Sequence, residues 1–209
     1  MKITKYRHAC LHVQDGDASI LIDPGVFSPG AAEVTGLTAV LITHSHPDHV
    51  DPDLLAAVLA SNPGVEVHAD PASVDLLRPV GIDARPTEPG DTLDLGTSVT
   101  VFGHDHAVIH RDVPVIPNRG YLLGGRLFHP GDALTVPDVP VELLALPAMA
   151  PWMAVKEAIE YVRAVAPPVA FPIHEQMLST TATVYRLLST LKPAETEWVD
   201  LDDGSTREF

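Results

Sequence analysis

Six consecutive residues, His44-Ser45-His46-Pro47-Asp48-His49, place three imidazoles and a carboxylate directly after the apolar run 39–43. A short β-branched apolar run is typical of a buried strand, and polar side chains at its end are held on a rigid element. His44 and His46 leave an extended segment on the same side, because side chains alternate along it. Pro47 favours a turn, which would aim Asp48 and His49 at a second position. The segment therefore predicts a metal site at the end of a strand.

Other strand-like runs also end in candidate ligands. Asp132 stands in a Pro-Gly-Asp sequence after an apolar run, and His174 directly follows the run 169–173. A turn aspartate and a packed core histidine are the alternative interpretations of these two residues. Imidazole nitrogen and carboxylate oxygen suit Zn²⁺, and also Mn²⁺ or Fe²⁺, and such sites often keep an open position for water.

One further histidine ligand is expected from the segment that follows the strand-like run 98–102. It holds His104, His106 and His110, and their spacing alone does not separate them.

Composition limits the class of protein. The chain has 28 acidic and 13 basic residues, for a formal charge of −15, which disfavours binding to long nucleic acids. No apolar run approaches the roughly 20 residues that span a bilayer, and the N-terminal residues lack the apolar stretch of a signal peptide. The single cysteine, Cys10, excludes an intramolecular disulfide and suits a reducing cytoplasm. We therefore expect a cytoplasmic protein with a small-molecule substrate and no membrane partner; a homo-oligomer is left open.

The order of expected elements predicts a layered α/β (α+β) fold. Residues 3–22 are expected to form a β-meander and 27–36 a loop, after which strands and helices alternate in both halves. A last helix is expected at 181–191 and a last strand at 197–201. No linker interrupts the 209 residues, so we expect one domain over 1–209.

The motif set resembles the metallo-β-lactamase superfamily. A His-x-His-x-Asp-His sequence after a strand, then a histidine, a Gly-Asp pair and a final histidine is the pattern of that superfamily. Further segments resemble its small single-domain metal-dependent hydrolases, the branch that includes ascorbate-6-phosphate-lactonase-like proteins. These segments are Arg7-His8-Ala9-Cys10, Asp23-Pro24 and His129-Pro130-Gly131-Asp132.

The resemblance implies an αββα sandwich with two divalent metal ions at one edge. It implies His44, His46 and His106 as ligands of the first metal, and Asp48, His49 and His174 as ligands of the second. Asp132 would bridge the two ions. His106 is selected over its neighbours because an alanine follows it, as in the family pattern.

The same resemblance suggests residues around the metals. His8 and Asp23 would lie beneath them, where a carboxylate can orient a ligand imidazole. A second set is expected to lie over or beside the site: His104 and His110 in a pocket, Arg111 or Arg119 on an anionic group of the substrate, and Trp152 in an apolar wall. Packed or solvated side chains are the alternatives for both sets.

These expectations amount to a dinuclear metal-dependent hydrolase of a small molecule with a lactone, ester, thioester, amide or phosphodiester bond. Two cations can share a hydroxide that serves as nucleophile near neutral pH, with zinc preferred and manganese or iron as alternatives. Asp48 is the expected catalytic residue, because it can hydrogen-bond that water as well as bind the second metal. The alternatives are a nucleotide phosphodiesterase or nuclease of the same fold, and a non-catalytic metal-bearing binding or regulatory protein.

Overall fold

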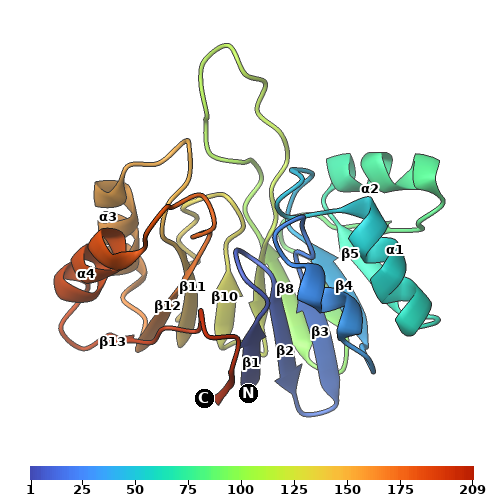
Figure 1. Cartoon of the computed structure of the whole chain (residues 1–209), viewed down its shortest axis with the longest axis horizontal. Coiled ribbons are helices and arrows are strands. Elements are labelled where there is room, and N and C mark those ends of the chain that lie inside the picture. Colours follow the sequence, from blue (N-terminus) through green and yellow to red (C-terminus); the bar gives the residue numbers. More distant parts are fainter.

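Two seven-stranded β-sheets face each other in the computed structural model, which describes residues 1–209 (Figure 1). The strands of the first sheet, in spatial order, are β14 (Thr206–Glu208), β1 (Lys2–Lys5), β2 (Leu11–Asp15), β3 (Ala18–Ile22), β4 (Ala39–Ile42), β5 (Glu66–Ala69) and β6 (Arg85–Pro86). The strands of the second sheet, in spatial order, are β13 (Glu197–Trp198), β12 (Val169–Ile173), β11 (Leu143–Pro147), β10 (Leu127–His129), β9 (Gly120–Leu123), β8 (Ser98–Phe102) and β7 (Thr92–Asp94).

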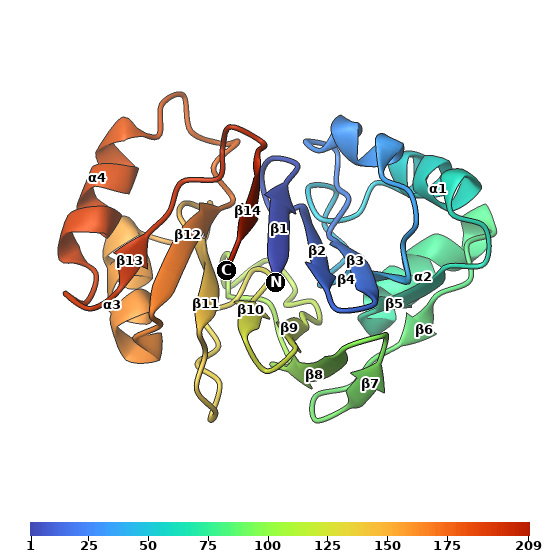
Figure 2. The same ribbon diagram turned by 90° about the horizontal axis from the view of Figure 1, so that it is seen from below.

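Helices cover the outer face of each sheet. The pair α1 (Pro52–Ser61) and α2 (Pro71–Leu77) packs on the first sheet, and the pair α3 (Val155–Val165) and α4 (Ala182–Leu191) packs on the second. The two pairs lie on opposite sides of the molecule when it is seen from below (Figure 2). The resulting order is helices, sheet, sheet, helices, so the predicted αββα sandwich is confirmed.

Alternation along the strands divides the apolar side chains among three cores. In β4, Leu41 faces the central core between the sheets, whereas Val40 and Ile42 pack towards α1 and α2. Both faces of such a strand are covered, which explains why it is apolar throughout. None of the helices combines the length and the apolar composition that crossing a bilayer requires.

Aspartate side chains cap two short helices. Asp51 accepts a hydrogen bond from the backbone N–H of Asp53 and is the N-cap of α1. Asp70 caps α2 in the same way, and each helix has proline in its first turn.

The structure differs from the sequence expectations mainly at the edges. The expected loop 27–36 contains a 3₁₀ helix, Pro29–Glu33, and the expected last strand 197–201 is shortened to β13. The final strand is instead β14, which pairs antiparallel with β1, Lys2 opposite Glu208. Its three residues, Thr-Arg-Glu, are all exposed. An edge strand without a buried face carries no hydrophobic alternation, so the sequence gives no signal for it.

Candidate metal centre

Four strand ends supply the predicted ligands. In the second sheet, β8, β10 and β12 run in the same direction, so the segments that follow them leave from one edge. Those segments carry His106, Asp132 and His174. The facing sheet contributes the segment 44–49 from the end of β4. The site therefore lies where the C-terminal ends of strands from both sheets meet.

The side chains converge into two groups. In each group, one potential ligand atom from every residue lies within 4.8 Å of the others; the groups are His44, His46, His106 and Asp132, and His8, Asp48, His49 and His174. All seven predicted ligands are brought together, and His8 joins them. Six of these eight residues are buried, and His46 and Asp48 are half-buried. The segment 104–110 contributes only His106, because His104 and His110 are exposed.

Hydrogen bonds to obligate acceptors fix the tautomers of three histidines. Nδ1 of His174 donates to the carbonyl oxygen of Met149 at 2.6 Å, and Nδ1 of His106 donates to the carbonyl oxygen of Ala107 at 2.5 Å. Nδ1 of His49 lies 2.7 Å from Oδ2 of Asp23. In the neutral ring each Nδ1 carries the proton, so each Nε2 presents a lone pair to the interior of the site.

Acceptors then face acceptors across the centre. The Nε2 atoms of His49 and His174 each lie 3.2 Å from an oxygen of Asp132, and Nε2 of His106 lies 3.4 Å away. These three nitrogens and Oδ1 of Asp132 are buried without a hydrogen-bond partner. Buried lone pairs that point at one another require positive charge between them. Divalent cations with nitrogen and oxygen ligands fit this requirement.

Asp132 is the residue that reaches both groups. Its Oδ1 faces His49, and its Oδ2 faces both His106 and His174. Nε1 of Trp152 donates a hydrogen bond of 2.9 Å to Oδ2, and the amide oxygen of Asn118 accepts from the backbone N–H of Asp132. These bonds hold the carboxylate in the position that a ligand shared by two cations needs.

Protons can meet the same demand for positive charge in the metal-free protein. Burial opposes the charged imidazole of His174, but the charge and hydrogen bond of Asp132 and the hydrogen bond of Asp48 outweigh it and raise the pKa to about 9. For the same reason, with Asp132 and Asp23 as partners, the pKa of His49 lies well above its usual value. Burial, by contrast, lowers the pKa of His44 and that of His46. The carboxyl pKa values of Asp48 and Asp132 fall despite burial, because histidines surround both groups.

Two glycines let the ligand-bearing segments approach closely. A Cβ on Gly25 would lie 2.1 Å from the carbonyl carbon and oxygen of Asp48. A Cβ on Gly131 would lie 2.3 Å from the amide oxygen of Asn118, and Gly131 also has a positive φ of 62°. Larger residues at either position would displace the backbone beside a predicted ligand.

The residues expected over or beside the site have different surroundings. The segment 103–119 forms a long loop that rises above the strands (Figure 1), and Arg111 and His110 are exposed on it. Arg119 is buried, and its guanidinium donates to the carbonyl oxygens of Thr87 and His104 and pairs with Glu88. Those bonds hold Arg119 at the base of the loop, and its contact with a substrate stays a prediction. Trp152 is half-buried, 5.9 Å from the ring of His106.

Sequence reasoning missed several groups that orient the histidines. One of these groups is the hydroxyl of Thr43, which contacts Nδ1 of His44. Thr43 lies directly before the histidine motif, so the sequence contained a signal for this contact. The carbonyls of Met149 and Ala107 left no signal, because any residue can supply a carbonyl oxygen.

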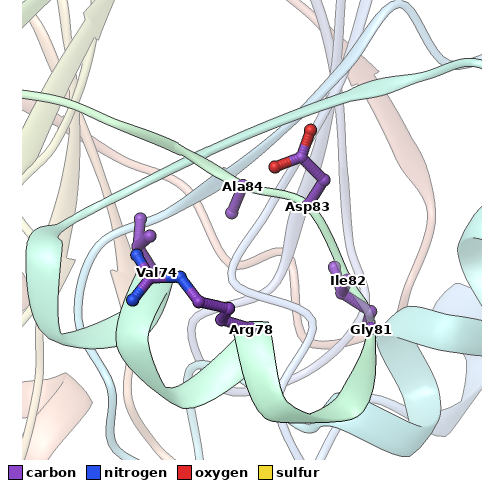
Figure 3. Close-up of a pocket in the computed structure, with 6 residues that line it drawn as sticks. All are labelled: Val74, Arg78, Gly81, Ile82, Asp83 and Ala84. Atoms are coloured by element: carbon purple, nitrogen blue, oxygen red, sulfur yellow. The ribbon is translucent and has the colours of Figure 1, made fainter.

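A hollow of about 220 Å³ lies away from this centre (Figure 3). It is lined by Val74, Arg78, Gly81, Ile82, Asp83 and Ala84 from α2 and the residues that follow it. Its one cation, Arg78, is paired with Asp75. Neither group of metal-binding side chains borders this hollow.

Comparison with known proteins agrees with the fold. The family described as a beta-lactamase superfamily domain matches residues 2–174. Protein Rv0786c of Mycobacterium tuberculosis is 46% identical over 188 residues, which cover 87% of each chain. A UPF0173 metal-dependent hydrolase of Aeropyrum pernix is 28% identical over 83% of this chain and 81% of its own. Among solved structures, the metallo-beta-lactamase fold protein YhfI of Bacillus subtilis superposes with a TM-score of 0.75 at 17% identity, covering 100% of this chain and 98% of that one.

The fold and the two groups define a protein of the metal-dependent hydrolase class. The chain belongs to the beta-lactamase superfamily, and its relatives include that superfamily's UPF0173 metal-dependent hydrolases. The family resemblance of the sequence is thereby confirmed.

Proposed function

We propose that the protein is a dinuclear metal-dependent hydrolase that acts on a small molecule with a lactone, ester, thioester, amide or phosphodiester bond. The observation that carries the proposal is the set of buried, unpartnered lone pairs on His49, His106, His174 and Asp132, which point at one another. Such an arrangement needs positive charge, and divalent cations with nitrogen and oxygen ligands supply it when all of these atoms act as acceptors.

The first metal is proposed to bind His44, His46 and His106, and the second Asp48, His49 and His174, with Asp132 shared. Zinc suits these ligands, and manganese and iron are the alternatives. When bound, two such ions lower the pKa of a water molecule and stabilise negative charge on a substrate oxygen. No serine or cysteine nucleophile is then needed, and Cys10 is buried with its thiol pKa raised by burial.

The chain's own residues orient this chemistry. Asp48 is half-buried, so its carboxylate can accept a hydrogen bond from the attacking water and orient it. The other ligands, apart from the half-buried His46, are buried, which keeps bulk water away from most of the charged centre. The formal charge of −15 favours a small substrate over long nucleic acids, and the buried free thiol of Cys10 is compatible with a cytoplasmic setting.

Elemental analysis tests the metal content directly. We expect about two metal ions per wild-type chain, and fewer in His46→Ala and in His106→Ala. Asp48→Asn should keep the fold but lose turnover in a screen of lactone, ester, thioester and phosphodiester substrates. His12→Ala is the matched control, because His12 lies on β2 and contacts Ser19 outside both groups.

The outcomes separate the candidate functions. A wild-type protein that binds no metal after reconstitution with Zn²⁺ or Mn²⁺ would exclude the hydrolase proposal. A protein that binds metal, shows no hydrolysis and keeps its affinity for a partner in the Asp48→Asn variant would be the binding or regulatory protein instead.

A further inference from the structure

His8 lies inside the second group, although it comes from a segment that is remote in sequence from the other members. The residue follows β1, is fully buried, and has a positive φ of 50°. Its ring lies 4.0 Å from the ring of His174 and 4.9 Å from that of Phe27. Proximity alone would allow His8 to be an additional metal ligand.

Hydrogen bonds to both ring nitrogens of His8 decide between ligation and another role. The backbone N–H of Gln176 points at Nδ1, at 3.3 Å, so Nδ1 must be an acceptor without a proton. The proton of the neutral ring is therefore on Nε2, which lies 3.0 Å from Oδ2 of Asp48. A nitrogen that carries a proton has no lone pair for a metal.

We propose that His8 is a positioning residue that donates from Nε2 to the Asp48 carboxylate and holds it in place, without itself binding metal. The inference rests on the proposed function, in which Asp48 binds the second metal. A carboxylate ligand loses rotational freedom when a fixed donor holds one of its oxygens. Hydrogen bonds to metal ligands commonly fix the orientation of the ligand in this way.

The backbone of His8 is fixed as firmly as its ring. Its N–H donates to Oε1 of Glu175 at 2.8 Å, and its carbonyl accepts from the N–H of His174 at 3.2 Å. Glu175 is in turn paired with the buried Lys5 at 2.6 Å. His8 thus joins the segment 174–176 to Asp48, two segments that each carry a proposed ligand of the second metal.

These contacts explain why a strained conformation is kept. A positive φ at a residue other than glycine is unfavourable and persists only where surrounding contacts impose it. His174 also has a positive φ, 66°, so the strain is concentrated where the two segments meet.

Nitrogen-15 NMR of histidine-labelled wild-type protein tests the proposal without a substitution. Two-bond nitrogen–proton correlations distinguish a protonated ring nitrogen, a free one and a metal-bound one. We expect His8 to have a proton on Nε2 and none on Nδ1, in both the metal-free and the zinc-loaded protein. A metal-bound signal from either ring nitrogen of His8 in the zinc-loaded protein would overturn the proposal.

Variants test the consequence for metal affinity. In a His46→Ala background, which isolates the second group, His8→Leu should weaken zinc binding about 10–100-fold in chelator competition. His8→Gln, whose amide can still donate, should recover most of that loss. His12→Gln is the matched control and should have no effect, since His12 contacts only Ser19 Oγ. Unchanged zinc affinity in His8→Leu would also overturn the proposal.

The proposed function and the role of His8 fail in different ways. A wild-type protein that never binds metal removes the hydrolase proposal. A zinc-loaded wild type with His8 coordinated leaves the hydrolase proposal intact and removes only the positioning role.

Discussion

Thr43 and Asp23 are joined by two hydrogen bonds of 2.7 Å, from the backbone N–H and the hydroxyl of Thr43 to the two carboxylate oxygens of Asp23. The hydroxyl oxygen lies 3.0 Å from Nδ1 of His44, and Oδ2 of Asp23 lies 2.7 Å from Nδ1 of His49. The buried carboxylate of Asp23 therefore orients one histidine of each group. It contacts His49 directly and acts on His44 through Thr43.

Asp23→Asn should weaken metal binding at both groups, by about 10–100-fold, because the amide replaces an acceptor that His49 and Thr43 both need. Zinc titration against a chromophoric chelator measures the effect. Asp51→Asn is the control, since asparagine caps a helix as well as aspartate does. Wild-type affinity in Asp23→Asn would show that the ligands are oriented without this carboxylate.

Gly25→Ala should disrupt the second group from outside it. The added methyl group would overlap the backbone of Asp48, so the segment 48–49 must move, at a cost of about 1–3 kcal/mol in the free energy of unfolding. The thermal unfolding temperature and the metal content of the variant should both fall. Gly30→Ala provides the comparison, because its Cβ would lie 3.4 Å from the Tyr6 ring, an ordinary contact. Equal behaviour of the two variants would contradict the close approach.

Trp152→Phe should loosen Asp132 while keeping an aromatic ring beside His106. The variant removes the 2.9 Å hydrogen bond from Nε1 to Oδ2, so metal affinity should drop by roughly tenfold with little change in stability. Trp198→Phe is the matched control, because Trp198 packs against Tyr185 under α4, away from the groups. The prediction fails if both tryptophan variants bind zinc like the wild type.

Metal binding should release protons. The pKa of His174 is about 9 in the metal-free protein, so this imidazole is protonated at pH 7 and must lose its proton to become a ligand. Apparent zinc affinity should therefore rise by at least about tenfold per pH unit between pH 6 and 8, and level off above pH 9. Isothermal titration calorimetry in buffers of different ionisation enthalpy counts the protons. An affinity independent of pH over this range would contradict the protonated state of His174.

The histidine motif and its strand were predictable because both signals are local. Residues 39–43 are apolar on both faces, and the ligands directly follow them. The three later ligands were found by the same reasoning at other strand ends. Only the resemblance to a family distinguished His106 from His104 and His110. Of these three residues, the structure places only His106 in one of the two groups.

The surroundings of the ligands were harder to predict. Arg119 was expected to contact substrate, but its charge is bound to Glu88 and to carbonyls of Thr87 and His104. An arginine in a polar segment looks the same in the sequence whether it is free or paired, since Thr87, Glu88 and His104 lie 15 or more residues away. The terminal strand β14 was missed because its residues have no buried face.

The sequence alone determined the layered fold class and the residue types of a nitrogen- and oxygen-based metal centre. Those features depend on short-range patterns: periodicity along strands and ligands adjacent to their ends. Only the tertiary structure decided that His8 contacts Asp48, that Asp23 serves one group directly and the other through Thr43, and that Asp132 lies between them. The first two contacts join segments of the first sheet that are remote in sequence, and the third joins the two facing sheets. Hydrogen-bond geometry exists only once the packing of these strands has fixed the atoms.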